Sequence, residues 1–410
     1  MFDSKRLVSN VRPFVRRMNI VKTKNFVIAV AVRLFKVVAG RMGVNGADKQ
    51  GLAQYNDMFE MATRLCRSYL PGSWKKITNK DICVKRISGG LSNWLYRVTL
   101  LKGNAEPRDV LMRLYGQTHG ENAIENIITE SVIFTLLSER GLGPKLHGIF
   151  PGGRLEEYIP VSSFTFSNAF CSHYARSLKS EELSDPKLSL MIAEKMAELH
   201  QLNIPINKDS TWLWDTMDRW LQQPIKDINW SRDNMELDQI LSTNLCDEAR
   251  WLKKHLSKLR SPVVFCHNDL QEGNILMKEN DPGCRSLCLI DYEYCAYNYR
   301  GFDIANHFVE WTYDYTNPIY PHYSVNRELF PTKDQQIEFL KRYSQCMENE
   351  ESIELILNEV NHFILASHLF WGVWSIVNSR MSKITFGYRE YAIERLKSYF
   401  KLKESLINNK

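Results

Sequence analysis

The sequence predicts an α+β protein with two lobes, a small, mainly β N-terminal lobe and a larger, mainly α C-terminal lobe. Its 410 residues exceed the roughly 100–200 residues of a typical domain, which favours two units. Short apolar runs between glycine and proline turns fill residues 80–160, whereas runs with helical spacing dominate after Pro160. We therefore place an N-terminal extension at residues 1–48, the first lobe at 49–160 and the second lobe at 161–410.

The first lobe opens with a predicted helix and continues mainly as strands. Leu52, Met58, Ala62 and Leu65 recur at helical spacing, and Pro71-Gly72 ends this helix. Apolar runs and turn residues then predict five strands and one more helix, with strands at residues 82–87, 95–101, 110–114, 145–150 and 155–159 and the helix at 125–140.

The second lobe is mainly helical. Apolar residues at helical spacing predict helices at residues 188–202, 215–221, 247–260, 303–313, 353–377 and 388–406. Two short apolar runs, 263–266 and 287–290, interrupt the helices and predict strands.

The charge of the chain is concentrated at its N-terminus. Residues 1–50 hold eleven Lys or Arg and two Asp, a net charge of +9, whereas the remaining residues carry −3, so we expect no nucleic-acid binding by the body. Phe26–Gly40 is apolar, but Arg33 and Lys36 interrupt it, and a spanning helix needs about 20 apolar residues. The alternatives are weak membrane contact through residues 1–45, a transit peptide, or an arm packed on the body, which we favour.

The nine cysteines are scattered and show no C-x₂-C pair. Their odd number and the length of the chain argue against a disulfide scaffold or a zinc set. We expect reduced thiols in a cytoplasmic protein.

The segment VVFCHNDLQEGNIL, residues 263–276, carries the clearest chemical signal. A strand-like run leads into His267-x-Asp269, and Asn274 follows five residues after the aspartate. A protein-kinase catalytic loop has this spacing, with the Asp accepting the proton of the substrate hydroxyl and the Asn holding a metal. We predict these roles for Asp269 and Asn274, with His267 in structural support.

Asp291 ends the apolar run 287–290 and completes the pattern. A carboxylate at a strand end in this order matches the Mg²⁺-binding aspartate of the kinase D-F-G motif. Tyr292-Glu293 replaces Phe-Gly, which points away from the protein kinases, and we give Glu293 a supporting role. The combination predicts a kinase-type phosphotransferase.

The first lobe supplies candidates for holding the nucleotide phosphates. The turn between the first two strands is rich in glycine, and its backbone N–H groups can approach phosphate oxygens: Ser88, Gly89, Gly90, Leu91, Ser92 and Asn93. Arg113, flanked by apolar residues in the third strand, stands where a kinase has its strand lysine. Glu130, on the following helix, is expected to pair with Arg113.

At these residues the sequence closely resembles the choline/ethanolamine kinase family, from about residue 80 to the C-terminus. The matching segments are SGGLSN (88–93), RLYG (113–116), ERGLGPKLHGIF (139–150), LEEYIP (155–160), HNDLQEGNIL (267–276), IDYEYCAYNYRGFDIANHFVEW (290–311) and FWGVWSIV (370–377).

The resemblance implies a protein-kinase-like fold, ATP, Mg²⁺ and direct transfer of the γ-phosphoryl group to choline, the first step of phosphatidylcholine synthesis from choline. It also implies a homodimer. Asp269 would be the base, with Asn274 and Asp291 as metal ligands. Gln271 would lie near the phosphates, and Glu157–Ile159 would offer backbone hydrogen bonds to adenine.

The choline branch of the family is favoured because aromatic residues are available to bind a quaternary ammonium. Such a head group has no N–H donor, and ring faces attract it through cation–π interactions. Trp371 and Trp374 share a helical face, Tyr294 follows Asp291 by three residues, and Glu310 could add negative charge. The remaining residues that resemble the family's choline-binding positions are Tyr315, Phe386, Tyr391 and Trp212, with Asp269 facing the hydroxyl.

Three alternatives stay open at this point. The first is an ethanolamine kinase or a kinase of dual specificity. The second is another small-molecule phosphotransferase of the same fold, such as one acting on aminoglycosides. The third is a silent, membrane-associated binding protein, against which the intact Asp269, Asn274 and Asp291 argue.

Overall fold

We analysed a computed structural model of the chain. It describes residues 51–87, 93–103, 106–115, 123–160, 174–222, 240, 242–281, 284–382 and 384–408. The N-terminal extension and residues 88–92 of the glycine-rich turn lie outside the described residues, so the predictions made for them stay predictions.

The described residues form two compact units. The first contains the chain up to Arg176, together with 204–206 and 278–284, and the second contains the rest. The boundary predicted at residues 160–161 stays a prediction, because residues 161–173 lie outside the described part of the chain.

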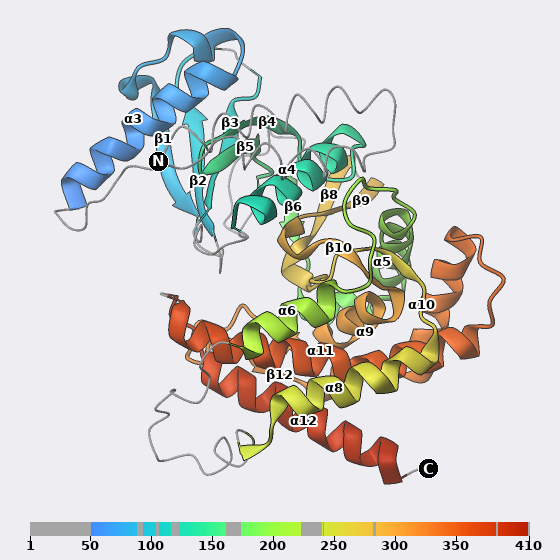
Figure 1. Ribbon diagram of the computed structural model, residues 1–410. Helices are drawn as coiled ribbons and strands as arrows, with labels where there is room; N and C mark the ends of the chain where they lie inside the picture. The colour runs from blue at the N-terminus through green and yellow to red at the C-terminus, as the bar shows by residue number, and fades with distance from the viewer. Residues whose placement is uncertain are drawn as a thin grey trace, which may run out of the picture. The chain divides into compact units, whose positions relative to one another are not determined.

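A five-stranded antiparallel sheet forms the body of the first unit (Figure 1), in the order β1-β2-β3-β5-β4. Burial alternates along β3 as far as Met112, but the next residue, Arg113, is buried too, so both faces of the sheet are covered at this point. The register sets Arg113 of β3 directly opposite Arg154 of β5. The strands are β1 Ile82–Ile87, β2 Asn93–Leu100, β3 Asp109–Tyr115, β4 Leu146–Phe150 and β5 Gly153–Glu157.

Helix α3, Gly51–Tyr69, packs its apolar residues against this sheet. Ala62, Leu65 and Cys66 join Val98 and Met112 in one buried cluster. The 3-10 turns η1, Gly72–Lys76, and η2, Asn79–Asp81, follow α3, and helix α4, Ala123–Glu139, connects β3 to β4. Removing this apolar surface from water is the main stabilising contribution to the unit.

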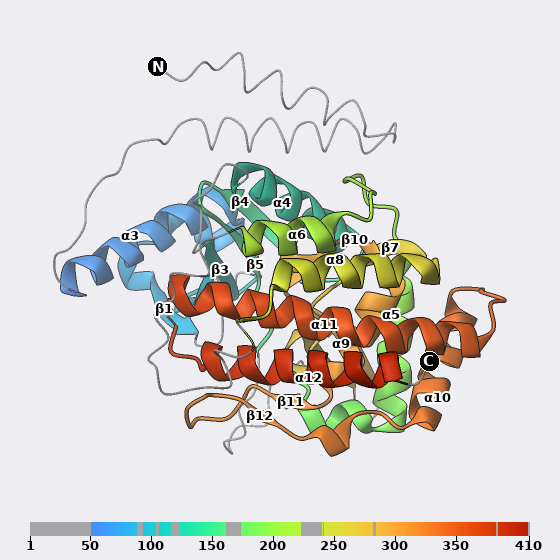
Figure 2. The ribbon, with the colours of Figure 1, turned by 60° about the horizontal axis from the view of Figure 1, so that its bottom comes forward.

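The second unit is mainly helical, and α11 and α12 run side by side in both views (Figures 1 and 2). Among the described residues, α11 alone is long and apolar enough to cross a membrane, and 83% of its apolar window is buried inside the protein. It therefore serves as the central core helix of the unit. The helices are α5 Pro186–His200, α6 Trp212–Leu221, α8 Leu245–Leu256, α9 Arg300–Glu310, α10 Lys333–Cys346, α11 Ile353–Met381 and α12 Tyr388–Asn408.

Short strands and turns carry the segments with chemical motifs. Strand β7, Val263–Cys266, pairs antiparallel with β10, Ala296–Tyr299. A three-stranded sheet has the order β6-β8-β9, with β6 Tyr174–Ser177, β8 Ile275–Asp281 and β9 Cys284–Leu289. A further pair consists of β11 Tyr313–Asp314 and β12 Ser324–Val325. The remaining 3-10 turns are η3 Ser180–Ser184, η5 Ser257–Leu259, η6 Glu272–Asn274, η7 Tyr292–Tyr294 and η8 Arg327–Leu329.

Most predicted elements are present, with ends shifted by a few residues. The strands predicted at 82–87 and 263–266 are confirmed with the same bounds. Helix α10 was not predicted, because its many charged and polar residues weaken the apolar periodicity. Seven cysteines of the described residues form no disulfide: Cys66, Cys83, Cys246, Cys266, Cys288, Cys295 and Cys346.

Candidate active site

The loop that follows β7 is held in place by the carboxylate of Asp303, near the start of α9. Asp303 accepts the backbone N–H of His267 at 2.8 Å on Oδ2 and that of Asn268 at 2.7 Å on Oδ1. His200 Nε2 lies 2.9 Å from Oδ2. Burial alone would raise the pKa of Asp303, but these hydrogen bonds and the nearby histidines outweigh it and lower that pKa. Asp303 thus remains a buried anion that fixes the start of the loop.

Asn268 adopts a left-handed conformation, with φ of 67°, and its side chain joins two further segments. Its Nδ2 donates to the carbonyl of Tyr294 at 2.9 Å, and its Oδ1 accepts from Asn298 at 2.8 Å. Asparagine tolerates this conformation better than most residues. The turn therefore requires a small polar residue that can bond locally.

Two histidines fix the loop to its surroundings. His267 donates from Nε2 to the carbonyl of Ile290 at 3.0 Å, which ties the loop to the residue before Asp291. His307 donates from Nδ1 to the carbonyl of Leu270 at 2.9 Å and accepts the indole N–H of Trp311 at 3.1 Å. Burial lowers the pKa of His307 to about 4, consistent with a neutral ring that both donates and accepts.

Asp269 and Asn274 are brought into direct contact. Asn274 Nδ2 donates to the backbone oxygen of Asp269 at 2.8 Å and to its Oδ2 at 3.0 Å. Burial raises the pKa of Asp269 well above the usual carboxyl value, and the charges of Glu310, Asp291 and Glu293 raise it further. Asp269 therefore holds its proton more tightly than a free carboxyl, and a cation bound nearby would favour its charged form.

Asp291 lies beside Asn274, because the N–H of Ile290 donates to the carbonyl of Asn274 at 3.0 Å. Asp291 itself is left-handed, with φ of 63°, at the turn after β9. The Asn274 amide nitrogen is engaged by Asp269, so its oxygen is the group available to a cation. One carboxylate and one amide oxygen form the hard donor set that Mg²⁺ prefers, and the residues present fit such an ion.

Tyr294, Trp371 and Trp374 form a cluster of perpendicular rings. Tyr294 and Trp371 have centroids 5.3 Å apart at 76°, and the two indoles are 5.5 Å apart at 78°. Each indole N–H is bonded, from Trp374 to the Tyr294 hydroxyl at 2.9 Å and from Trp371 to Asn306 Oδ1 at 2.7 Å. These bonds fix the direction in which each ring face points.

The other residues predicted for choline join this cluster through ring contacts. Tyr391 has centroid distances of 6.5 Å to Trp374, 6.1 Å to Tyr315 and 5.7 Å to Phe386. The Tyr315 hydroxyl donates to Glu310 Oε2 at 2.8 Å. Trp212 is more remote, since it contacts Phe370, which in turn lies against Trp371. The structure brings the predicted set together, with Trp212 at its outer end.

In the first unit, the arginine that pairs with Glu130 differs from the expectation. Glu130 bonds to Arg154 at 2.5 Å, and Arg113 bonds to Glu156 at 3.3 Å. Arg154 lies opposite Arg113 in the sheet. Its side chain reaches α4, where the guanidinium carbon lies 4.1 Å from the centroid of the Phe134 ring. The expected Arg113–Glu130 pair is therefore wrong, and Arg113 is buried in a shared network instead.

The roles predicted for Gln271, Glu157 and Ile159 in binding the nucleotide stay predictions. Gln271 turns its Oε1 toward its own loop and accepts the N–H of Gly273 at 2.9 Å. The backbone N–H of Glu157 donates to Lys145 O at 2.7 Å, and Ile159 follows the end of β5.

Three residues that the sequence analysis missed connect the loop to the ring cluster. Asn306 donates to Asn268 O at 3.4 Å and accepts from Trp371. Glu272 is buried and accepts the backbone N–H of Tyr315; burial, then the charge of Glu310, raises the pKa of Glu272 to about 8. Arg395 bonds to Glu310. The signal for Arg395 was its i,i+4 spacing from Tyr391 on one helix.

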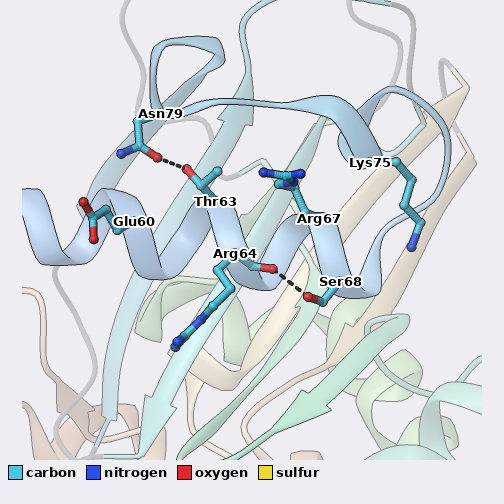
Figure 3. A pocket seen from close by; sticks show the side chains of 7 residues that line it. All are labelled: Glu60, Thr63, Arg64, Arg67, Ser68, Lys75 and Asn79. Carbon is cyan, nitrogen blue, oxygen red and sulfur yellow. Dashed lines mark hydrogen bonds between the residues drawn. The ribbon is translucent and has the colours of Figure 1, made fainter.

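A hollow of about 500 Å³ lies in the first unit between α3, η1 and η2 (Figure 3). Its lining is mainly polar and basic, and Arg64, Arg67 and Lys75 are exposed. Hydrogen bonds join Thr63 to Asn79 and Ser68 to the Arg64 carbonyl. None of the predicted site residues lines this hollow.

The sequence model of the choline/ethanolamine kinase family matches residues 84–400 of the chain. This chain belongs to the choline/ethanolamine kinase family. It is a kinase, and its substrates are ATP and either choline or ethanolamine. Family membership favours these two amines over the aminoglycoside alternative.

Curated relatives and solved structures agree with this assignment. The chain is 43% identical over 365 residues to a human choline/ethanolamine kinase, covering 86% of this chain and 88% of the relative. It is 44% identical to mouse choline kinase alpha, covering 83% and 80% of the two chains. It is 30% identical to a probable ethanolamine kinase of Dictyostelium discoideum, covering 84% and 92%.

Among solved structures, a choline kinase from Cryptosporidium parvum matches with a TM-score of 0.68 and 27% identity, covering 85% of this chain and 96% of the other. The predicted protein-kinase-like α+β fold, with a β-rich N-terminal and a mainly helical C-terminal part, is confirmed.

Proposed function

We propose that this protein is a choline kinase, which makes phosphocholine by direct in-line transfer of the γ-phosphoryl group of ATP. The observation that carries the proposal is the perpendicular arrangement of Tyr294, Trp371 and Trp374, with both indole N–H groups already bonded. Tyr294 and Trp374 are partly exposed, so ring surface is available to a cation without N–H donors, which is how quaternary ammonium ligands are recognised.

The acidic groups near the rings complement the charge of choline. Asp269 and Glu310 interact electrostatically with each other, and Asp269 also interacts with Tyr294. Burial raises the pKa of Tyr294 well above its usual value, so its phenol is neutral at physiological pH. The negative charge therefore comes from carboxylates, and the rings supply the apolar faces.

Asp269 is the proposed base for the choline hydroxyl. Asn274 holds its Oδ2, and Asp303 holds the backbone of the two preceding residues, so the carboxylate is oriented before substrate binds. A bound choline cation lowers the pKa of Asp269 and favours its charged form. Such positioning suits phosphoryl transfer, which needs orientation and charge neutralisation more than covalent help.

Asn274 and Asp291 are the residues that would hold Mg²⁺. When bound, the ion neutralises charge on the transferred phosphoryl group. The hydrogen bond from Ile290 to Asn274 keeps the two ligand-bearing segments together.

The direct test compares ATP turnover with choline and with ethanolamine, side by side, in the presence of Mg²⁺. We expect a higher kcat/KM for choline. Equal values would establish the dual-specificity alternative, which the name of the human relative, a choline/ethanolamine kinase, supports. A higher value for ethanolamine would contradict the proposal. Cytoplasmic location, a homodimer and a role in phosphatidylcholine synthesis are further parts of this proposal.

A further inference from the structure

Arg395, on α12, is a buried cation within the ring cluster that the proposed reaction does not use. It is 0% exposed, and its Nη2 donates to Glu310 Oε1 and to the Tyr391 hydroxyl at 2.5 Å. Among the described residues, its Nε and Nη1 atoms are buried without a hydrogen-bond partner. A buried guanidinium with two unpartnered nitrogens is costly, which calls for a compensating interaction or a role.

Aromatic faces compensate part of this cost. The Arg395 guanidinium carbon lies 3.9 Å from the ring centroid of Tyr313 and 4.9 Å from that of Tyr391. The protein thus already contains one cation bound by an acid and ring faces, the same chemistry that a substrate ammonium requires.

Arg395 changes what Glu310 can offer to a substrate. Glu310 is the last residue of α9, where the helix dipole disfavours a negative charge, and Arg395 balances that charge. Both carboxylate oxygens already accept a bond, Oε1 from Arg395 and Oε2 from the Tyr315 hydroxyl. Glu310 is therefore a buried, already paired carboxylate, which has less hydrogen-bonding capacity left for an incoming amine.

The two possible amines differ in what they need from such a group. The primary ammonium of ethanolamine has three N–H donors, and losing water from them is costly unless acceptors replace it. The trimethylammonium of choline has no donor and binds to ring faces without new hydrogen bonds. A Glu310 whose two oxygens already accept bonds thus disfavours ethanolamine more than choline.

We propose that Arg395 is a specificity-determining residue that favours choline over ethanolamine by pairing with Glu310. This inference rests on the proposed function, because it assumes that the amine lies against the ring cluster. Arg395 acts through Glu310 and need not touch the substrate.

The test measures kcat/KM for both amines in the full-length protein and in Arg395→Met. We expect the ethanolamine-to-choline ratio of kcat/KM to rise by roughly tenfold or more, mainly through the KM for ethanolamine, with the KM for ATP unchanged. In the double variant Arg395→Met/Glu310→Gln this rise in the ratio should disappear, because position 310 then has no carboxylate that the loss of Arg395 could release from its ion pair.

Two further variants separate selectivity from stability. Tyr315→Phe frees Glu310 Oε2 without removing a buried charge, although it also removes the hydroxyl contacts to Tyr391 at 2.8 Å and to Arg395 Nη2 at 3.3 Å. It should raise the same ratio by a few-fold, or about 1 kcal/mol or less. Arg300→Met breaks another buried Arg–Glu pair of the helical unit, to Glu359, and should destabilise the protein with the ratio unchanged. If Arg395→Met does not fold, Tyr315→Phe decides the question.

An unchanged ratio in Arg395→Met or, failing that variant, in Tyr315→Phe would overturn the role of Arg395 while wild-type turnover stayed normal. A shift of the ratio toward choline would overturn it equally. Absence of wild-type turnover on both amines would instead overturn the proposed function and this inference with it.

Discussion

Two adjacent regions of the helical unit are built in different ways. The loop at residues 267–274 is held by polar bonds to Asp303, His307 and Asn298, and His267 and Asn268 are 0% exposed. The ring cluster is held mainly by edge-to-face contacts, and Tyr294 and Trp374 are only partly buried.

The difference separates orientation from recognition. Hydrogen bonds fix direction, so they suit the groups that must be placed before a reaction. Ring faces attract a cation over a broad surface and depend less on exact angles, so they suit a round ammonium head. A variant should therefore affect turnover when it touches the loop and amine affinity when it touches the rings.

The largest effect is expected for Asp269→Asn. Removing the proposed base should lower kcat by about 10²–10⁴-fold, the usual contribution of general base catalysis. Asn274 still has the Asp269 carbonyl as a partner, so the fold should persist. Steady-state kinetics and thermal unfolding check the two parts, and near-normal kcat would remove Asp269 from the mechanism.

Asp303→Ala should affect stability and turnover together. It leaves two backbone N–H groups and His200 without their buried acceptor, at a cost of about 3–5 kcal/mol in the free energy of unfolding. Urea denaturation measures this loss. The exposed Asp247→Ala is the matched control and should change stability by about 0.5 kcal/mol or less. A similar small change in Asp303→Ala would show that the loop needs no such anchor.

Mild acid should lower the stability of the protein through protonation of His307, which holds the loop at residues 267–274. Its pKa in the folded protein, about 4, lies below the ordinary histidine value of 6.5, so between these values the unfolded chain binds a proton that the folded protein does not. The free energy of unfolding should fall as pH drops from 6.5 toward 4, with His307 contributing about 1.5 kcal/mol of this fall between pH 6.5 and 5. His307→Gln should make this slope shallower, and an equal slope in both proteins would contradict the assignment.

Trp374→Ala should produce the smallest and most selective effect. Loss of one cation–π face costs about 0.5–2 kcal/mol, which corresponds to a rise of up to about thirtyfold in the KM for choline. The KM for ATP should stay the same. Equal changes in both constants would mean that Trp374 is a core residue, and the contrast between the two regions would fail.

The sequence was sufficient to predict that Asp269 and Asn274 lie together, because the two residues belong to one short loop. Asp269 and Asn274 are five residues apart, and the same short segment that separates them also brings them into contact. The strands at 82–87 and 263–266 were equally predictable, because apolar runs between turns are local signals.

Pairings between distant segments could not be predicted in the same way. The partner of Glu130 depends on which arginine of the sheet reaches α4, and only the register of β3 and β5 sets this. The bond between Arg395 and Glu310 joins residues 85 positions apart.

The sequence by itself determined the kinase chemistry, through the spacing of Asp269, Asn274 and Asp291, and it indicated which aromatic residues to consider. Only the tertiary structure decided how the rings face one another and that Glu310 is already paired with a buried arginine. The physical reason is range: bonding along a short segment follows from residue order, whereas the packing of α9, α11 and α12 follows from the whole core.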